Sequence, residues 1–119
     1  MNRIEIEVLN PQQALTAFSK AWHGVTEDKV ATPRLAFSSL RELFSAITEK
    51  RLELLRHVAA QEGLNTRQLA QGLGRDYKNI HTDVTDLVEL GLLEKNDKGA
   101  LSAPFDEIVI HAGLRSNAA

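Results

Sequence analysis

Two apolar-periodic stretches joined through a single glycine, between residues 66 and 89, constrain the fold of this chain most strongly. The first stretch has apolar residues at the inward positions of a short helix: Leu69, Ala70 and Leu73. Gly74 then allows a tight turn, and Asp76 can cap a second helix by accepting hydrogen bonds from its free N–H groups. The pattern therefore predicts two helices that cross closely at a turn.

The second helix is expected to have one apolar and one polar face. At about 100° per residue, its apolar residues fall in one sector: Tyr77, Ile80, Val84, Leu87, Val88 and Gly91. The opposite sector is uncharged or basic in the first two turns and acidic in the last: Lys78, Asn79, Thr82, Thr85, Asp86 and Glu89. Such a helix is suited to enter the major groove of DNA with its N-terminal half and to leave the duplex with its C-terminal half.

Side chains of the polar face have the chemistry of base recognition. Lys78 suits a guanine or a phosphate, Asn79 can bind an adenine edge through two hydrogen bonds, and Thr82 suits a base edge or a thymine methyl. Thr66 and Arg67, at the start of the preceding helix, are expected to face phosphates.

Five further residues border this candidate surface. Arg75 is interpreted as a phosphate contact, and His81 as a surface histidine or phosphate contact. Tyr77 is included among the candidate DNA-contact residues, and is expected in the core or at its rim rather than as a platform for base stacking. Asp83, with Asp86 one turn later, is interpreted as a solvated face or a clamp on Arg75, rather than as a catalytic pair of carboxylates.

A short hairpin is predicted after the second helix. Residues 91–95 and 100–104 are expected to be strands, and Asn96-Asp97-Lys98-Gly99 supplies the turn. Lys95 and Lys98 at its tip are placed to reach a backbone phosphate. The expected class is α+β, mainly α: a winged helix-turn-helix with an N-terminal strand-helix-strand extension.

The predicted organisation has three parts, with boundaries at residues 1–37, 38–104 and 105–119. Residues 3–9 alternate in polarity as a strand does, residues 34–37 are extended and are expected to pair with that strand, and a helix is expected from about residue 11 to 23. Residues 105–114 are either a strand or a short helix, and Ile108-Val109-Ile110 favours a strand. Within 38–63 we expect two helices, the first beginning after Ser38 or Ser39 with these residues inward: Leu40, Leu43, Phe44 and Ile47. The second is expected to begin at Thr48 and to end near Gly63.

The flanking parts either pack on the winged domain or form a homodimer interface, and we favour the dimer. A two-fold pair doubles the phosphate contacts and can read a palindrome. The candidate interface residues are apolar and lie in the N-terminal extension: Ile4, Ile6, Val8, Leu15, Phe18 and Trp22.

Composition limits the remaining classes of function. The chain has 119 residues and no cysteine. Its net charge of −2 argues mildly against a nucleic-acid partner. Residues 66–82 are nevertheless locally basic, with Arg67, Arg75 and Lys78 against Asp76 alone. The histidines have no metal-ligand spacing, and no catalytic constellation is present, so we expect no enzyme, metal or cofactor. No apolar run is long enough for a membrane span and no apolar signal core is present, so the expected location is the cytoplasm.

The stretch Thr48–Leu93 resembles winged helix-turn-helix regulators of the MarR and ArsR type. The matching residues are Thr48-x-x-Arg51-x-x-Leu54-Leu55, Thr66-Arg67-Gln68-Leu69-Ala70, Leu73-Gly74-Arg75-Asp76, Asp83-Val84-x-x-Leu87 and Gly91-Leu92-Leu93. A closer resemblance, through Phe37-Ser38-Ser39 and Pro104-Phe105-Asp106-Glu107-Ile108, is to small prokaryotic winged-helix proteins described as DNA-binding regulators or antitoxins. The resemblance implies a repressor of transcription that binds double-stranded DNA, and an autoregulating antitoxin is one form of it. The alternative is an interaction module that acts mainly by holding a toxin protein, through a surface around Leu15, Phe18 and Trp22.

Overall fold

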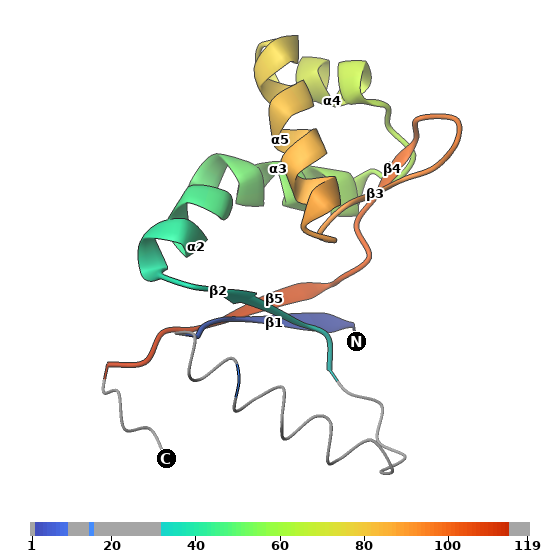
Figure 1. The fold of residues 1–119 in the computed structure, drawn as a ribbon. Helices are drawn as coiled ribbons and strands as arrows, with labels where there is room; N and C mark the ends of the chain where they lie inside the picture. The colour runs from blue at the N-terminus through green and yellow to red at the C-terminus, as the bar shows by residue number, and fades with distance from the viewer. Residues whose placement is uncertain (1, 10–14, 16–31, 115–119) are drawn as a thin grey trace. The chain divides into compact units, whose positions relative to one another are not determined.

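The structure is a computed structural model that describes residues 2–9, 15 and 32–114. It is an α+β fold in two units, Met1–Asn2 with Ala46–Asp106 and Arg3–Ser45 with Glu107–Ala119 (Figure 1). The described elements, in chain order, are β1 (Arg3–Val8), β2 (Arg34–Phe37), α2 (Leu40–Ala46), α3 (Glu49–Ala60), α4 (Thr66–Leu73), α5 (Tyr77–Glu89), β3 (Glu94–Lys95), β4 (Leu101–Ser102) and β5 (Glu107–His111). No helix in the described part is long and apolar enough to cross a membrane.

Side-chain caps set the start of each helix in the first unit. The Thr48 side chain accepts a hydrogen bond from the Arg51 backbone N–H at the start of α3. Asn65 and Gln68 form a reciprocal capping box at the start of α4. Gly74, with φ of 62°, ends α4 in the left-handed region, where a side chain is disfavoured. The predicted turn at Gly74 is confirmed, and the helix predicted to begin at Thr48 is present, with Thr48 as its N-cap and Glu49 as its first residue.

The core of the first unit lies among α3, α4, α5 and the residues around the hairpin. Its largest fully buried side chains are aliphatic: Leu54, Val58, Leu69, Ile80, Leu87, Leu93 and Leu101. Each such burial contributes about 1.5–3 kcal/mol. α4 contacts both α3 and α5, and Ala70 at 4% exposure allows the close approach. This packing fixes which face of α5 is exposed.

The predicted hairpin is present, with shorter strands than expected. β3 and β4 pair antiparallel, with Glu94 opposite Ser102 and Lys95 opposite Leu101. The Asn96 side chain accepts hydrogen bonds from two N–H groups of the turn, both at 2.9 Å. On its other side Leu101 exchanges backbone hydrogen bonds with Gly63 and Leu64, at 2.9 and 2.8 Å. The hairpin is therefore anchored to the segment that leads into α4.

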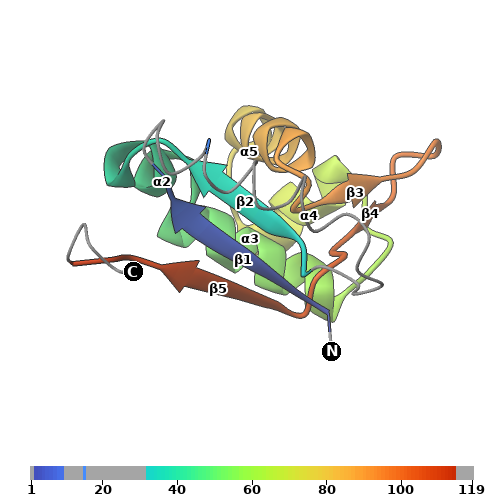
Figure 2. The same ribbon diagram turned by 60° about the horizontal axis from the view of Figure 1, so that its bottom comes forward.

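The second unit contains a three-stranded sheet in the order β2-β1-β5, in which both pairings are parallel (Figure 2). Opposite residues lie on the same face of a sheet, so the register separates an apolar from a polar face. The apolar face comprises Ile4, Ile6, Val8, Leu35, Phe37, Ile108 and Ile110. The polar face contains an ion-pair cluster in which Arg34 lies 3.9 Å from Glu5 and 3.8 Å from Glu7. The strand in residues 105–114, which the sequence favoured, is confirmed, as is the pairing of 34–37 with the N-terminal strand.

The structure differs from the expectations at α2. The sequence predicts Leu40 and Phe44 to be inward, but they are 42% and 60% exposed, whereas Leu43 is fully buried. Phe44 lies about 100° around the helix from Leu43. The buried stripe of this seven-residue helix is narrow, so Phe44 falls at its edge. The units divide after Ser45, and two residues separate β2 from α2; the predicted boundary after Phe37 stays a prediction. The helix predicted at residues 11–23 lies almost entirely outside the described residues, and its one described residue, Leu15, is helical.

Candidate nucleic-acid interface

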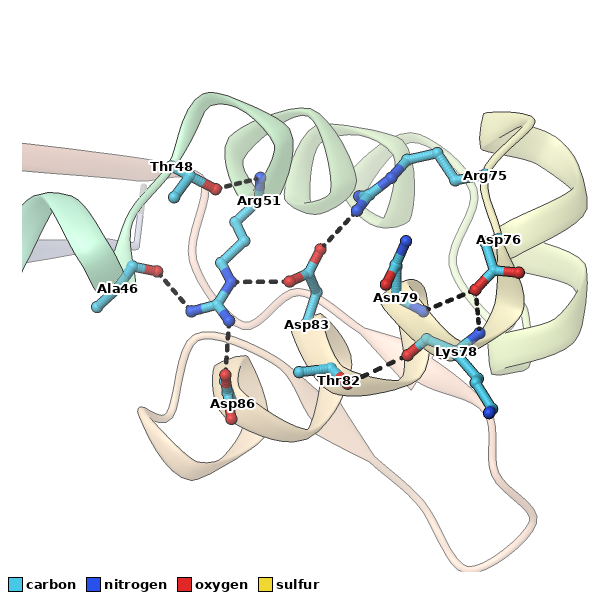
Figure 3. Close-up of polar contacts among 10 residues, drawn as sticks. All are labelled: Ala46, Thr48, Arg51, Arg75, Asp76, Lys78, Asn79, Thr82, Asp83 and Asp86. Carbon is cyan, nitrogen blue, oxygen red and sulfur yellow. Dashed lines mark hydrogen bonds and ion pairs between the residues drawn. The ribbon is translucent and has the colours of Figure 1, made fainter.

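The first two turns of α5 expose a polar surface, here called the α5 polar face, made of Lys78, Asn79, His81 and Thr82. Ile80, between them in sequence, is fully buried, so these four side chains lie away from the core. Thr82 donates its hydroxyl hydrogen bond to the Lys78 carbonyl at 3.1 Å. The Lys78 side chain extends away from the ion pairs deeper in the unit (Figure 3).

Asp76 begins α5 as predicted. Its carboxylate accepts hydrogen bonds from the backbone N–H groups of Lys78 and Asn79, at 3.1 and 3.4 Å (Figure 3). A carboxylate here stabilises the helix because it balances the partial positive charge of the N-terminus. It also places one exposed negative charge beside the α5 polar face.

An aromatic and cationic cluster joins the beginnings of α4 and α5. The Arg67 guanidinium carbon lies 5.0 Å from the centroid of the Tyr77 ring, and the Tyr77 and His81 rings lie 5.9 Å apart. Tyr77 is 41% exposed, so of its two predicted positions it takes the rim rather than the core. A cation over an exposed aromatic ring contributes about 0.5–1 kcal/mol, which is enough to restrict the Arg67 side chain.

The carboxylates of α5 are bound by two arginines from outside the helix. Arg51 on α3 lies 3.0 Å from Asp83 and 2.5 Å from Asp86, and also donates to the Ala46 carbonyl at 2.9 Å (Figure 3). Arg75, in the turn before α5, lies 3.0 Å from the other oxygen of Asp83. The side chains of Arg51 and Asp83 are only 12% and 15% exposed. Asp83 therefore holds α3, the turn and α5 together.

The surroundings of Arg51 keep it cationic. Burial by itself lowers the pKa of Arg51, but hydrogen bonds to Asp83 and Asp86, and the negative charges of both, outweigh burial and raise that pKa above its ordinary value. The negative charges of Asp83 and Asp86 are thus compensated within the unit.

Comparison with known proteins assigns a family. The HVO_A0114 family model matches residues 46–110. The chain belongs to the HVO_A0114 family. No curated protein and no solved structure matches the chain.

The HVO_A0114 match covers α3 to α5, the hairpin and most of β5, and so contains all ten predicted DNA-contact residues. Eight of them have exposed side chains: Arg67, Tyr77, Lys78, Asn79, His81, Thr82, Lys95 and Lys98. Lys95 lies on β3, and Lys98 lies in the hairpin turn. The structure therefore brings the α5 polar face and the Arg67 cluster together on α4 and α5, with the two hairpin lysines on a neighbouring element.

Two predicted contacts are less exposed than expected in this HVO_A0114 member. Thr66 is 7% exposed, because it lies three and four residues before the buried Leu69 and Ala70 and shares their face of α4. Arg75 has a side chain that is 21% exposed and is paired with Asp83. Only Nη2 of Arg75 is paired with Asp83, and its Nη1 is buried without a hydrogen-bond partner. The predicted clamp of Asp83 on Arg75 is confirmed, but Asp86 pairs with Arg51 instead.

Sequence reasoning missed the role of Arg51. It was recognised only as part of the family pattern, because its partners lie 32 and 35 residues away and no local spacing connects them. The acidic residues of α5 do offer a signal for such a partner. Two carboxylates that pack against the rest of the unit require cationic partners, because burying an unpaired charge is costly.

The residues predicted to form a dimer interface lie in different environments. Ile4 and Ile6 are 5% and 0% exposed, because β1 is the central strand, so they are core residues of one subunit rather than surface available to a dimer partner. Val8 is half-buried, and Leu15 is 68% exposed. Phe18 and Trp22 lie outside the described residues. In the described part, no group of three or more possible metal ligands occurs.

Proposed function

We propose that this protein is a sequence-specific double-stranded DNA-binding regulator of transcription, with α5 as the recognition helix of a winged helix-turn-helix. One observation carries the proposal: the first two turns of α5 expose Lys78, Asn79, His81 and Thr82, while the next two carboxylates, Asp83 and Asp86, are paired with Arg51 and Arg75. A DNA-facing helix needs hydrogen-bonding groups at its surface and no uncompensated carboxylates toward the phosphates.

The elements around α5 support the same function. Three helices followed by a two-stranded hairpin, with the hairpin also hydrogen-bonded to the segment before α4, have the order of a winged helix. Lys95 and Lys98 on that hairpin offer phosphate contacts, and Arg67 offers another at the start of α4. Phosphate contacts supply affinity, and base contacts from Lys78 and Asn79 supply sequence discrimination.

The proposed regulator is a repressor whose operator overlaps a promoter, its own promoter in the case of an autoregulating antitoxin. Because the net charge of the chain is −2, electrostatic attraction to DNA has to come from the basic residues at the interface rather than from the whole protein. We therefore expect modest affinity from a single copy and a strong dependence on salt.

The test measures binding of Lys78→Ala and Asn79→Ala to the best site selected from a random duplex library. Each variant is expected to lose about 1–3 kcal/mol, which is roughly a 5- to 150-fold rise in Kd at one fixed salt concentration. Lys50→Ala is the matched control, since it removes the same charge from an exposed position on α3. Unchanged binding in both α5 variants would rule out α5 as the recognition helix.

Arg67→Ala separates positioning from recognition. If Arg67 binds a phosphate, its loss weakens binding to selected and unrelated duplexes alike, and the slope of log K against log salt falls by about one. A loss confined to the selected duplex would make Arg67 a base reader.

No shift of any duplex at low salt, together with a stable complex with the product of the neighbouring gene, would favour the interaction module instead. The exposed Leu15 is the described residue on which that alternative depends.

A further inference from the structure

β5 is an edge strand of the parallel sheet. β1 pairs with one side of it, and no other described strand pairs with its second side. An edge of this kind presents unpaired N–H and C=O groups to any strand that can align with it. Ile110 on this strand is 41% exposed, and Ile108 and Val109 are half-buried. The edge is therefore apolar and has no charged residue at its centre.

The sequence of β5 is complementary to itself in the antiparallel direction. When two copies align about a two-fold axis at Val109, Ile108 of each lies opposite Ile110 of the other, and Val109 lies opposite itself. Glu107 at one end then lies opposite His111 at the other. His111 Nε2 already lies 2.8 Å from Glu5 Oε1 in its own subunit, so each end brings a second carboxylate to an imidazole. Alignment at Val109 is also the register that pairs all five residues of the strand.

The other edge, β2, does not have this complementarity. β2 has four residues and follows Pro33, which has no N–H to donate. Centring two copies on Leu35 puts Arg34 opposite Ala36, and centring them on Ala36 puts Arg34 opposite Ser38. Neither register gives the one charged residue of β2 an oppositely charged partner.

We propose that a second copy of this chain pairs with the β5 edge, antiparallel and centred on Val109. The result is one six-stranded sheet in the order β2-β1-β5-β5-β1-β2. The occupant is a second copy because charge, apolar pattern and length of β5 all match β5 itself. The proposal does not depend on DNA binding, since its test measures only the association of subunits.

A single cysteine tests the axis directly, because the chain has no cysteine of its own. In Val109→Cys the two thiols face each other across the two-fold axis. Directly opposed residues have Cα atoms about 4.5–5.5 Å apart, within the range of about 4.4–6.8 Å that a disulfide requires. Under mild oxidation we expect a disulfide-linked dimer from this variant.

The matched control is Ala36→Cys, at the other edge of the sheet. Ala36 is exposed and lies on the same face as Val109, because Glu7 opposes Ala36 and Glu5 opposes Val109. Val109→Cys should cross-link at least about tenfold faster than Ala36→Cys at micromolar protein, because the interface holds its thiols at a millimolar effective concentration. Faster cross-linking of Ala36→Cys would overturn the proposal and place the interface at β2.

Sedimentation equilibrium of the unmodified chain and of Ile110→Lys completes the test, and covers the case that Val109→Cys fails to fold. The unmodified chain should be a dimer. Ile110→Lys places a charge against Ile108 of the partner subunit and should raise the dimer dissociation constant at least about tenfold, with an unchanged circular dichroism spectrum. A monomeric unmodified chain, or a folded Ile110→Lys variant that dimerises as tightly as the unmodified chain, would overturn the proposal.

Discussion

Replacing Arg51 with methionine tests whether the ion-pair network is structural. The methionine retains an unbranched side chain but removes every hydrogen bond to Asp83, Asp86 and Ala46. At about 4 Å and an effective dielectric constant near 20, one such pair has a Coulomb energy of about 4 kcal/mol, most of which offsets the loss of hydration. Removal of one partner is costly because the other remains buried without compensation.

The magnitude follows from the exposure of each partner. Breaking a buried pair costs about 3–5 kcal/mol, and Asp83 is only 15% exposed, but Arg75 still holds it and reduces the loss. Asp86 is 44% exposed and contributes at most about 1 kcal/mol. We therefore expect Arg51→Met to lower the free energy of unfolding by about 3 kcal/mol.

Urea unfolding followed by circular dichroism measures this change. With a slope of about 2 kcal/mol per molar urea, the midpoint should fall by about 1.5 M. Lys50→Met is the control, since it alters the exposed neighbour and should change stability by less than about 0.5 kcal/mol. Equal effects of the two substitutions would refute the structural role of Arg51.

The pH dependence of the same difference has a definite sign. Because folding raises the pKa of Arg51, the stability that Arg51 contributes is fully present below its unfolded pKa and is lost only as pH rises through the folded pKa. Arginine stays protonated throughout the usual range, so the difference between unmodified chain and Arg51→Met should stay constant from about pH 7 to pH 10.

Three further predictions concern α4, α5 and the turn between them. Asp76→Ser keeps a capping oxygen but removes the exposed carboxylate beside the α5 polar face, so we expect tighter binding to DNA in a titration at fixed salt. An unchanged Kd would contradict the proposed orientation of α5. Gly74→Ala should lower the free energy of unfolding by about 1 kcal/mol, because the φ of Gly74 is +62°. Nothing lies within 4 Å of the added Cβ, so the loss comes from backbone strain alone, and unchanged stability in urea unfolding would contradict that strain. Leu87→Ala should cost about 2–5 kcal/mol in the same assay because Leu87 is fully buried, whereas a loss below about 1 kcal/mol would mean that the core collapses around the gap.

Local signals in the sequence predicted α4, α5 and the turn between them well. The Asp76 cap, the turn at Gly74 and the start of a helix at Thr48 depend on residues within four positions of each other. The cap and the turn occur as expected, and Thr48 is the N-cap of a helix that begins at Glu49. The alternation of residues 3–9 likewise predicted a strand, although it could not show that this strand is central and therefore buried.

Features that depend on distant residues were not predictable in this way. Nothing near Arg51 in sequence indicates Asp83 as its partner, and nothing near Thr66 distinguishes a buried from an exposed first turn except its spacing from Leu69. For the α5 polar face, periodicity predicted exposure correctly, but the pairing of the acidic residues that follow required the packed structure.

The parallel sheet has a consequence for the order in which the chain folds. β1 aligns Arg3 with Glu107, so its second neighbour is synthesised about a hundred residues after it. The helices and hairpin between them are stabilised by contacts closer in sequence and can form while the ribosome still holds β5. Until β5 emerges, β1 keeps an open edge, and during that interval the nascent chain is most exposed to mispairing and to chaperone capture.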